Sequence, residues 1–240
     1  MRYTLRDNVA LAIGLGLAGT AGLGWIAGWA LDAGARYPLQ ATASFIVIMA
    51  IAVGAADAPH PYPRFGPANI VTTARAVLVA LVAGLIGEPA THDVLWVAIG
   101  VTAVVAGLDG LDGWLARHTR MASAFGARFD METDAFLILA LSVLVWLHGK
   151  AGAWVLVCGA MRYGFVAAGW MLPWLARPLT STRRGKAVAV GQFLGLSIAL
   201  APIIPPPVSG VVALVTVVAL SWSFAIDVRR LMVSYFPAQN

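Results

Sequence analysis

The sequence predicts an all-α protein that crosses a membrane with eight helices. Of its 240 residues, 60% are hydrophobic and only 11% are charged, whereas soluble domains carry roughly 25% charged residues. The mean hydropathy is +0.83. These values exclude a disordered chain, a disulfide scaffold and an ordinary soluble enzyme. The single cysteine, Cys158, can form no intrachain disulfide.

Eight apolar segments, separated by short polar breaks, predict the helices. Each is close to the ~20 residues that an α-helix needs to cross a bilayer core. Helices suit this environment because each satisfies its own backbone polar groups. The first segment is too long for a typical signal sequence, so we expect it to be retained. The segments lie at about 9–31, 39–56, 68–87, 93–117, 129–148, 151–175, 187–204 and 208–228.

A polar stretch with several prolines, DAPHPYPRFGP at 57–67, is the main break in the pattern. It predicts an N-terminal extension of two helices with a linker, residues 1–66, followed by a six-helix unit, residues 67–240. Pro205, Pro206 and Pro207 predict a tight turn between the last two helices.

The basic residues predict the orientation in the membrane. Twelve of the 16 Lys and Arg residues lie at the termini or in the even-numbered loops, whereas Arg36 and Lys150 lie in the odd-numbered loops. Because basic residues accumulate in cytoplasmic loops, we expect both termini in the cytoplasm. This distribution explains the pI of about 9.9 without a nucleic-acid partner.

Four aspartates lie near the cytoplasmic ends of two neighbouring segments. Asp109 and Asp112 are three residues apart, and Asp130 and Asp134 are four apart, so each pair shares one helical face. Because the link at 118–128 is short, the two acidic faces should meet. An acidic residue at the centre of a membrane helix costs ~2.5–3.5 kcal/mol, so something must compensate these charges.

Carboxylates without Cys or His suit a hard divalent ion such as Mg²⁺ or Mn²⁺. In the alternative, the aspartates cap helices or pair with Arg117, Arg120 and Arg128. Gly113 and Gly126 fall beside the carboxylates, either for helix packing or to leave room for a flat group.

Together these residues spell Asp109-x2-Asp112-Gly113-x2-Ala116-Arg117-x8-Gly126-x3-Asp130-x3-Asp134. The pattern resembles the signature of the CDP-alcohol phosphotransferase family, with every fixed position filled. Asn69-x2-Thr72-x2-Arg75 also resembles the opening of the first core helix in many members. The resemblance covers residues 68 to about 232, so the N-terminal extension lies outside the common core.

The resemblance implies a six-helix membrane fold, usually a homodimer, with its active site at the cytoplasmic interface. In a bacterium this is the inner (plasma) membrane. Family members transfer a substituted phosphoryl group from a CDP-linked donor to an alcohol and release CMP. Most bacterial members use CDP-diacylglycerol as the donor.

The resemblance also implies roles for individual residues. Asp109, Asp112 and Asp130 would ligate metal, and Asp134 would ligate a second ion and act as the base on the acceptor hydroxyl. Arg117 would either bind the pyrophosphate or brace the carboxylates. The implied nucleotide-binding residues are Asn69, Thr72, Asp112, Gly113, Ala116, Arg117 and Gly126.

The acceptor alcohol is the open part of this interpretation. Basic residues that suit a phosphorylated acceptor, such as glycerol 3-phosphate or an inositol phosphate, are Arg162, Arg183, Arg184 and Lys186. The cytoplasmic bias of basic residues explains Arg183 and Arg184 about equally well. Serine, choline and ethanolamine stay open as unphosphorylated acceptors.

A second pattern bears on the acceptor. Gly185-Lys186 and Gln192 resemble a step in members that make phosphatidylglycerophosphate or phosphatidylinositol phosphate. The second Lys and the Thr that are usual in the glycerophosphate enzymes are absent, because Ala187 to Val190 stand there.

Two other classes of function remain. A cation transporter could use the aspartates, although we find no inverted repeat and no acidic partners across the remaining depth. A non-catalytic family member is disfavoured by the intact motif. Release of CMP distinguishes the enzyme from both.

Overall fold

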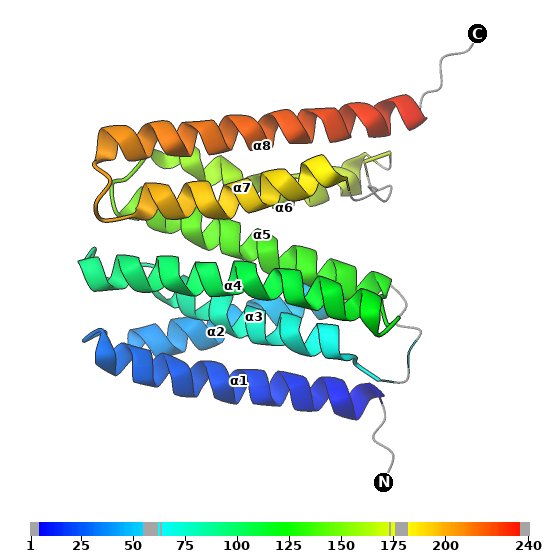
Figure 1. The fold of residues 1–240 in the computed structure, drawn as a ribbon, viewed down its shortest axis with the longest axis horizontal. Coiled ribbons are helices and arrows are strands. Elements are labelled where there is room, and N and C mark those ends of the chain that lie inside the picture. The colour runs from blue at the N-terminus through cyan, green and yellow to red at the C-terminus, as the bar shows by residue number, and fades with distance from the viewer. Residues whose placement is uncertain (1–4, 55–61, 63, 173, 176–181, 236–240) are drawn as a thin grey trace. The chain divides into compact units, whose positions relative to one another are not determined.

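The computed structural model describes residues 5–54, 62, 64–172, 174–175 and 182–235. Outside the described part lie the Arg183 side chain and, from the predicted linker, residues 57–61 and 63. The described residues form helices and no strands (Figure 1). The helices are α1 (Leu5–Ala30), α2 (Arg36–Gly54), α3 (Pro67–Gly84), α4 (His92–His118), α5 (Ala124–Leu147), the short 3-10 helix η1 (Ala153–Leu156), α6 (Val157–Met171), α7 (Arg183–Leu200) and α8 (Pro206–Tyr235).

Each predicted segment overlaps one of the eight α-helices in the described residues, so the predicted fold class is confirmed. Six spans in the described residues are long and apolar enough to cross a membrane, namely those of α1, α2, α3, α4, η1 with α6, and α8. The other two contain several charged residues: α5 carries Arg128, Asp130, Glu132 and Asp134 in its first three turns, and α7 begins with Arg183, Arg184 and Lys186. The chain is therefore an integral membrane protein.

Helix boundaries differ from the apolar boundaries where polar residues continue a helix. The α5 helix begins at Ala124, before the apolar run, because the Ser123 hydroxyl accepts a hydrogen bond from the N–H of Gly126 at 3.0 Å, as an N-cap residue does. The α8 helix continues to Tyr235, past the predicted end near 228. The apolar segment gives the part of a helix that lies in the membrane, and the helix itself can be longer.

The chain divides into two compact units, Met1–Ala140 and Leu141–Asn240. The first unit holds α1 to α4 and most of α5, and the second holds the end of α5 and the remaining helices. The predicted functional division into residues 1–66 and 67–240 remains a prediction. In the first unit, however, the N-terminal extension packs on the core helix α3.

A row of small residues lets α1 approach α2. Gly16, Thr20 and Gly24 lie four residues apart and are buried. A Cβ atom at Gly16 would lie 2.3 Å from the Phe45 ring, and one at Gly24 would lie 3.2 Å from the Cα of Pro38. Small residues at this spacing permit close packing of membrane helices. Gly16 and Gly24 therefore serve packing within the first unit.

Polar side chains of α2 complete the C-terminal end of α3. The hydroxyl of Tyr37 donates to the carbonyl oxygen of Leu81 at 3.1 Å. The Gln40 amide donates to Ala83 at 3.3 Å and to Ile86 at 3.1 Å. The last carbonyl groups of a helix lack intrahelical partners. The extension thus stabilises the helix that also carries Asn69, Thr72 and Arg75.

In the second unit, a buried lysine donates hydrogen bonds to carbonyl groups at the C-terminal end of α7. The ammonium of Lys150 donates to the carbonyl oxygens of Ala201 at 2.8 Å and Ile204 at 2.7 Å. The Ser209 hydroxyl donates to the carbonyl oxygen of Lys150 at 2.5 Å. These bonds surround the turn between α7 and α8, where the sequence predicts one. Pro206 begins α8, a position that suits proline.

Candidate active site

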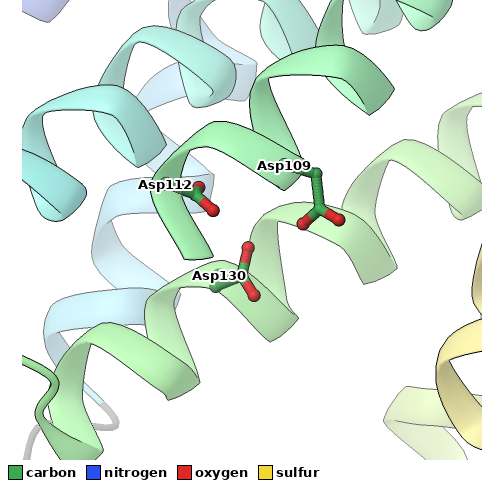
Figure 2. Close-up of side chains that lie close together, drawn as sticks. All are labelled: Asp109, Asp112 and Asp130. Carbon is green, nitrogen blue, oxygen red and sulfur yellow. The ribbon is translucent and has the colours of Figure 1, made fainter. Parts of the chain in front are cut away.

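Four aspartates of the motif meet within the first unit. Figure 2 shows the carboxylates of Asp109 and Asp112, on α4, directed toward Asp130 on α5. Ligand oxygens of these three residues lie within 4.8 Å of one another. The prediction that the two acidic faces meet is therefore confirmed. The short link between His118 and Ala124 brings the two helices together at this end.

Arg75, on α3, is the counter-ion of this cluster. Its Nη1 contacts Asp112 at 2.5 Å and also Asp130, while Nη2 contacts Asp109 at 3.0 Å and also Asp134. Each terminal nitrogen therefore joins one carboxylate of α4 to one of α5. In the described part of the chain, no ion pair joins the four aspartates to Arg117, Arg120 or Arg128.

The cluster is buried on one side and open on the other. The Arg75 side chain is 0% exposed and that of Asp112 is 5% exposed, whereas Asp109 and Asp130 are 35% and 38% exposed. Asp134 is intermediate at 21%. Asp109 and Asp130 therefore form the side from which a ligand can reach the cluster.

The charges in the cluster do not balance. One arginine faces four aspartates, so the net charge is 1 − 4 = −3 when all four carboxylates are ionised. Like charges at this separation repel each other. Oxygen ligands without nitrogen or sulfur are those that Mg²⁺, Mn²⁺ and Ca²⁺ prefer. The residues therefore fit a hard divalent ion.

Two of the predicted nucleotide-binding residues, Asn69 and Thr72, lie on α3, and Thr72 contacts the cluster. The Thr72 hydroxyl donates to Oδ2 of Asp112 at 3.1 Å. The Asn69 amide donates to the carbonyl oxygen of Phe65 at 2.5 Å, and its Oδ1 would lie 2.7 Å from a Cβ atom at Gly126. Gly126 is therefore required where α5 passes Asn69 closely.

The remaining motif residues lie along the exposed side of α4. Arg117 lies over Gly113, since a Cβ atom there would be 3.3 Å from Nη1 of Arg117. Ala116 is half-buried beside it. His118 stacks on Trp114 with ring centroids 4.8 Å apart. Arg117 is thus exposed to a ligand and makes no ion pair with the carboxylates in the described residues.

The predicted acceptor residues belong to the second unit. Arg184 contacts Asp227 and donates to the carbonyl oxygen of Ser223 at 3.3 Å, so Asp227 compensates its charge. Lys186 is exposed and Arg162 is half-buried. Gln192 donates to the carbonyl oxygen of Thr216 at 2.8 Å, which gives it a role in helix packing. Convergence of these bases near the aspartates remains a prediction.

The contacts of Arg75 with all four aspartates were not predicted from the sequence. A signal was present, because Arg75 lies inside an apolar segment where an unpaired charge is costly. The four aspartates also required compensation. Only the two observations together point to Arg75.

Comparisons with known proteins agree with the motif. The family model described as CDP-alcohol phosphatidyltransferase matches residues 65–225. A CDP-diacylglycerol--glycerol-3-phosphate 3-phosphatidyltransferase of Pseudomonas fluorescens is 31% identical over 119 residues, which cover 49% of this chain and 59% of that relative. The chain thus matches less than two thirds of the relative's length. No solved structure matches the chain.

The family match extends over well more than half of the chain. It includes Arg75, the four aspartates and the glycines between them. The chain therefore belongs to the CDP-alcohol phosphatidyltransferase family.

Proposed function

We propose that this protein transfers a phosphatidyl group from a CDP-linked lipid, CDP-diacylglycerol, to an alcohol and releases CMP. The observation that carries this proposal is the meeting of four motif aspartates around one buried arginine. Such a concentration of carboxylates in an apolar protein costs free energy. A reaction that requires bound cations explains why the carboxylates are placed there despite this cost.

The cluster would hold one or two divalent ions, Mg²⁺ or Mn²⁺. Three ligand oxygens that lie close together come from Asp109, Asp112 and Asp130. Asp134 contacts the same guanidinium, that of Arg75. When bound, the metal would offset the charge of the diphosphate and stabilise the CMP leaving group.

Asp134 is the best candidate for the base. In the proposed reaction the acceptor hydroxyl oxygen forms a bond to the lipid-side phosphorus of the diphosphate. The bond from that phosphorus to the bridging oxygen breaks, and CMP leaves with the electron pair. The hydroxyl proton passes to the Asp134 carboxylate, which Arg75 orients through Oδ1. Proton transfer to a positioned side chain contributes typically about 10²–10⁴-fold to a rate.

The nucleotide would lie along the exposed side of α4. Gly113 and Ala116 offer little side-chain bulk there, and the Arg117 guanidinium is exposed. Arginine binds phosphate groups in a bidentate way. The Thr72 hydroxyl donates to Asp112, and Asn69 lies close to Gly126. We therefore assign Arg117 to the diphosphate and not to the bracing of the carboxylates.

The acceptor that we favour is glycerol 3-phosphate. The matched relative is named for transfer to that alcohol, and Lys186 is an exposed base near the start of α7. Arg184 is less suited to bind an acceptor phosphate, because Asp227 already compensates its charge. Inositol phosphate and the unphosphorylated alcohols serine, choline and ethanolamine are the alternatives. We further propose a homodimer with cytoplasmic termini and active site in the bacterial inner membrane.

The experiment is an assay of CMP release by the purified protein in detergent with CDP-diacylglycerol and Mg²⁺. The acceptors are glycerol 3-phosphate, inositol 1-phosphate, inositol, serine, choline and ethanolamine. We expect release with glycerol 3-phosphate and a loss of at least about 100-fold in Asp134→Asn. Release with another acceptor alone would correct the acceptor. If no acceptor gives CMP, and neither CMP nor the CDP-lipid binds, the proposed reaction is wrong.

A further inference from the structure

Arg75 occupies the space between the carboxylates that the proposed metal ions would use. Its two terminal nitrogens carry four of the five N–H donors of a guanidinium. All four aspartates contact these two nitrogens. The guanidinium and a metal ion would therefore seek the same oxygen atoms.

The position of Arg75 depends on the aspartates. Its side chain is 0% exposed, and its Nε atom has no hydrogen-bond partner within the described residues. Within the described part of the chain, the hydrogen bonds of the guanidinium all go to aspartate oxygens. When a metal ion competes for those oxygens, no other hydrogen bond from these residues holds the guanidinium in place.

The net charge of the cluster depends on Arg75 and on the proposed metal ion. Without Arg75 the four carboxylates would carry −4 instead of −3. Such a cluster would be harder to assemble without metal, because its members repel each other. It would also attract a divalent ion more strongly. Arg75 therefore stabilises the metal-free site and lowers the affinity of the site for a metal ion.

We propose that Arg75 is a built-in counter-ion that holds the four carboxylates together before metal binds and competes with divalent ions for their oxygens. Arg75 is thus a positioning residue that sets the metal affinity of the site. This inference rests on the proposed metal-dependent function. It adds that a residue outside the ligand set tunes the affinity.

The test measures Mn²⁺ binding to the full-length protein in detergent by electron paramagnetic resonance of the free ion. Arg75→Gln removes the charge, and we expect its dissociation constant for Mn²⁺ to fall by at least about tenfold. Arg75→Lys keeps the charge but lacks the planar fork that reaches several carboxylates. We expect its dissociation constant to fall by a smaller factor. The matched control is Arg184→Gln, which removes an arginine paired with one aspartate in the second unit and should leave Mn²⁺ binding unchanged.

Thermal unfolding provides a second readout. In EDTA, Arg75→Gln should unfold at a lower temperature than the wild-type protein, because its carboxylates lack their counter-ion. Saturating Mn²⁺ should restore more of its stability than Mn²⁺ adds to the wild-type protein, since tighter binding stabilises more. If Arg75→Gln does not fold even with Mn²⁺ throughout purification, the affinity of Arg75→Lys decides.

The outcomes separate this inference from the proposed reaction. Unchanged or weaker Mn²⁺ binding in both Arg75 variants would overturn the inference, even if the wild-type protein releases CMP. Tighter Mn²⁺ binding in the variants would support the inference, and it would do so even if the wild-type protein released no CMP and bound neither CMP nor the CDP-lipid, which would reject the reaction. A wild-type protein that binds no Mn²⁺ would overturn both.

Discussion

Two buried cations, one in each unit of the chain, differ in what surrounds them. Lys150, which is 8% exposed, donates to two neutral carbonyl oxygens at the end of α7. Arg75, which is fully buried, faces four carboxylates. Carbonyl groups at a helix end carry partial negative charge, which one ammonium can match. The aspartates exceed what one guanidinium can compensate.

This difference separates a contact that is complete in itself from one that a metal ion would complete in the proposed function. Around Lys150 both carbonyl oxygens accept a hydrogen bond from the ammonium, and no excess of negative charge remains. Around Arg75 an excess of negative charge remains and is partly exposed. A buried cation alone does not indicate a site, but a buried cation with too many anions does.

The largest effect that would test this comparison is expected at Asp112. Replacing Asp112 by Asn removes a carboxylate that Arg75 and Thr72 hold at 2.5 and 3.1 Å. An outer-shell partner of a metal typically contributes about 10–100-fold to activity, and a ligand should contribute more. We expect CMP release to fall beyond that range. Asp93→Asn, at an exposed position in the first turn of α4, is the control and should remain active.

A large effect on stability alone is expected at Lys150. Lys150→Met leaves the carbonyl groups of Ala201 and Ile204 without their donor, which should lower the free energy of unfolding by about 1.5–3 kcal/mol. The melting temperature in detergent measures this loss. CMP release per folded molecule should stay within about twofold of the wild-type value. A loss of activity as severe as that of Asp112→Asn would break the distinction between the two cations.

Two glycines of the motif allow effects on stability to be separated from effects on nucleotide binding. Gly126→Ala places a Cβ atom 2.7 Å from Oδ1 of Asn69, whose amide is fixed on Phe65. We expect a destabilisation of about 1–3 kcal/mol, measured by thermal unfolding. Gly113→Ala meets only the mobile end of Arg117 at 3.3 Å and should fold normally.

The Gly113 variant then isolates nucleotide binding. Because alanine suits a helix better than glycine does, the melting temperature should be equal or higher. We expect a higher KM for CDP-diacylglycerol with little change in stability. An unchanged KM would mean that Gly113 serves helix packing and does not contact the nucleotide.

The smallest effect is expected at Tyr37, a neutral counterpart of Lys150. Its hydroxyl also donates to a carbonyl oxygen at a helix end, that of Leu81 on α3. Tyr37→Phe should cost about 0.5–1.5 kcal/mol, less than the loss of a charged donor at Lys150. Chemical denaturation in detergent measures it. An effect larger than that of Lys150→Met would show that charge is not what distinguishes the two contacts.

The sequence by itself determined the helices and the motif. Apolar segments long enough for a bilayer predicted each of the eight α-helices in the described part of the chain, because this signal is local. The spacings of Asp109 with Asp112 and of Asp130 with Asp134 placed each pair on one helical face, since the period of a helix is fixed. The short link then brought the two faces together.

The tertiary structure decided the partners. Arg75 lies 34 residues before Asp109, and its contacts depend on the packing of α3 beside α4 and α5. The donors of Lys150 and Tyr37 reach carbonyl groups of helices 51 and 44 residues away. Local periodicity carries no information about which distant helix end lacks a donor or which arginine enters an acidic cluster. Packing fixes these choices, because a buried charge or polar group must find its partner wherever the fold supplies one.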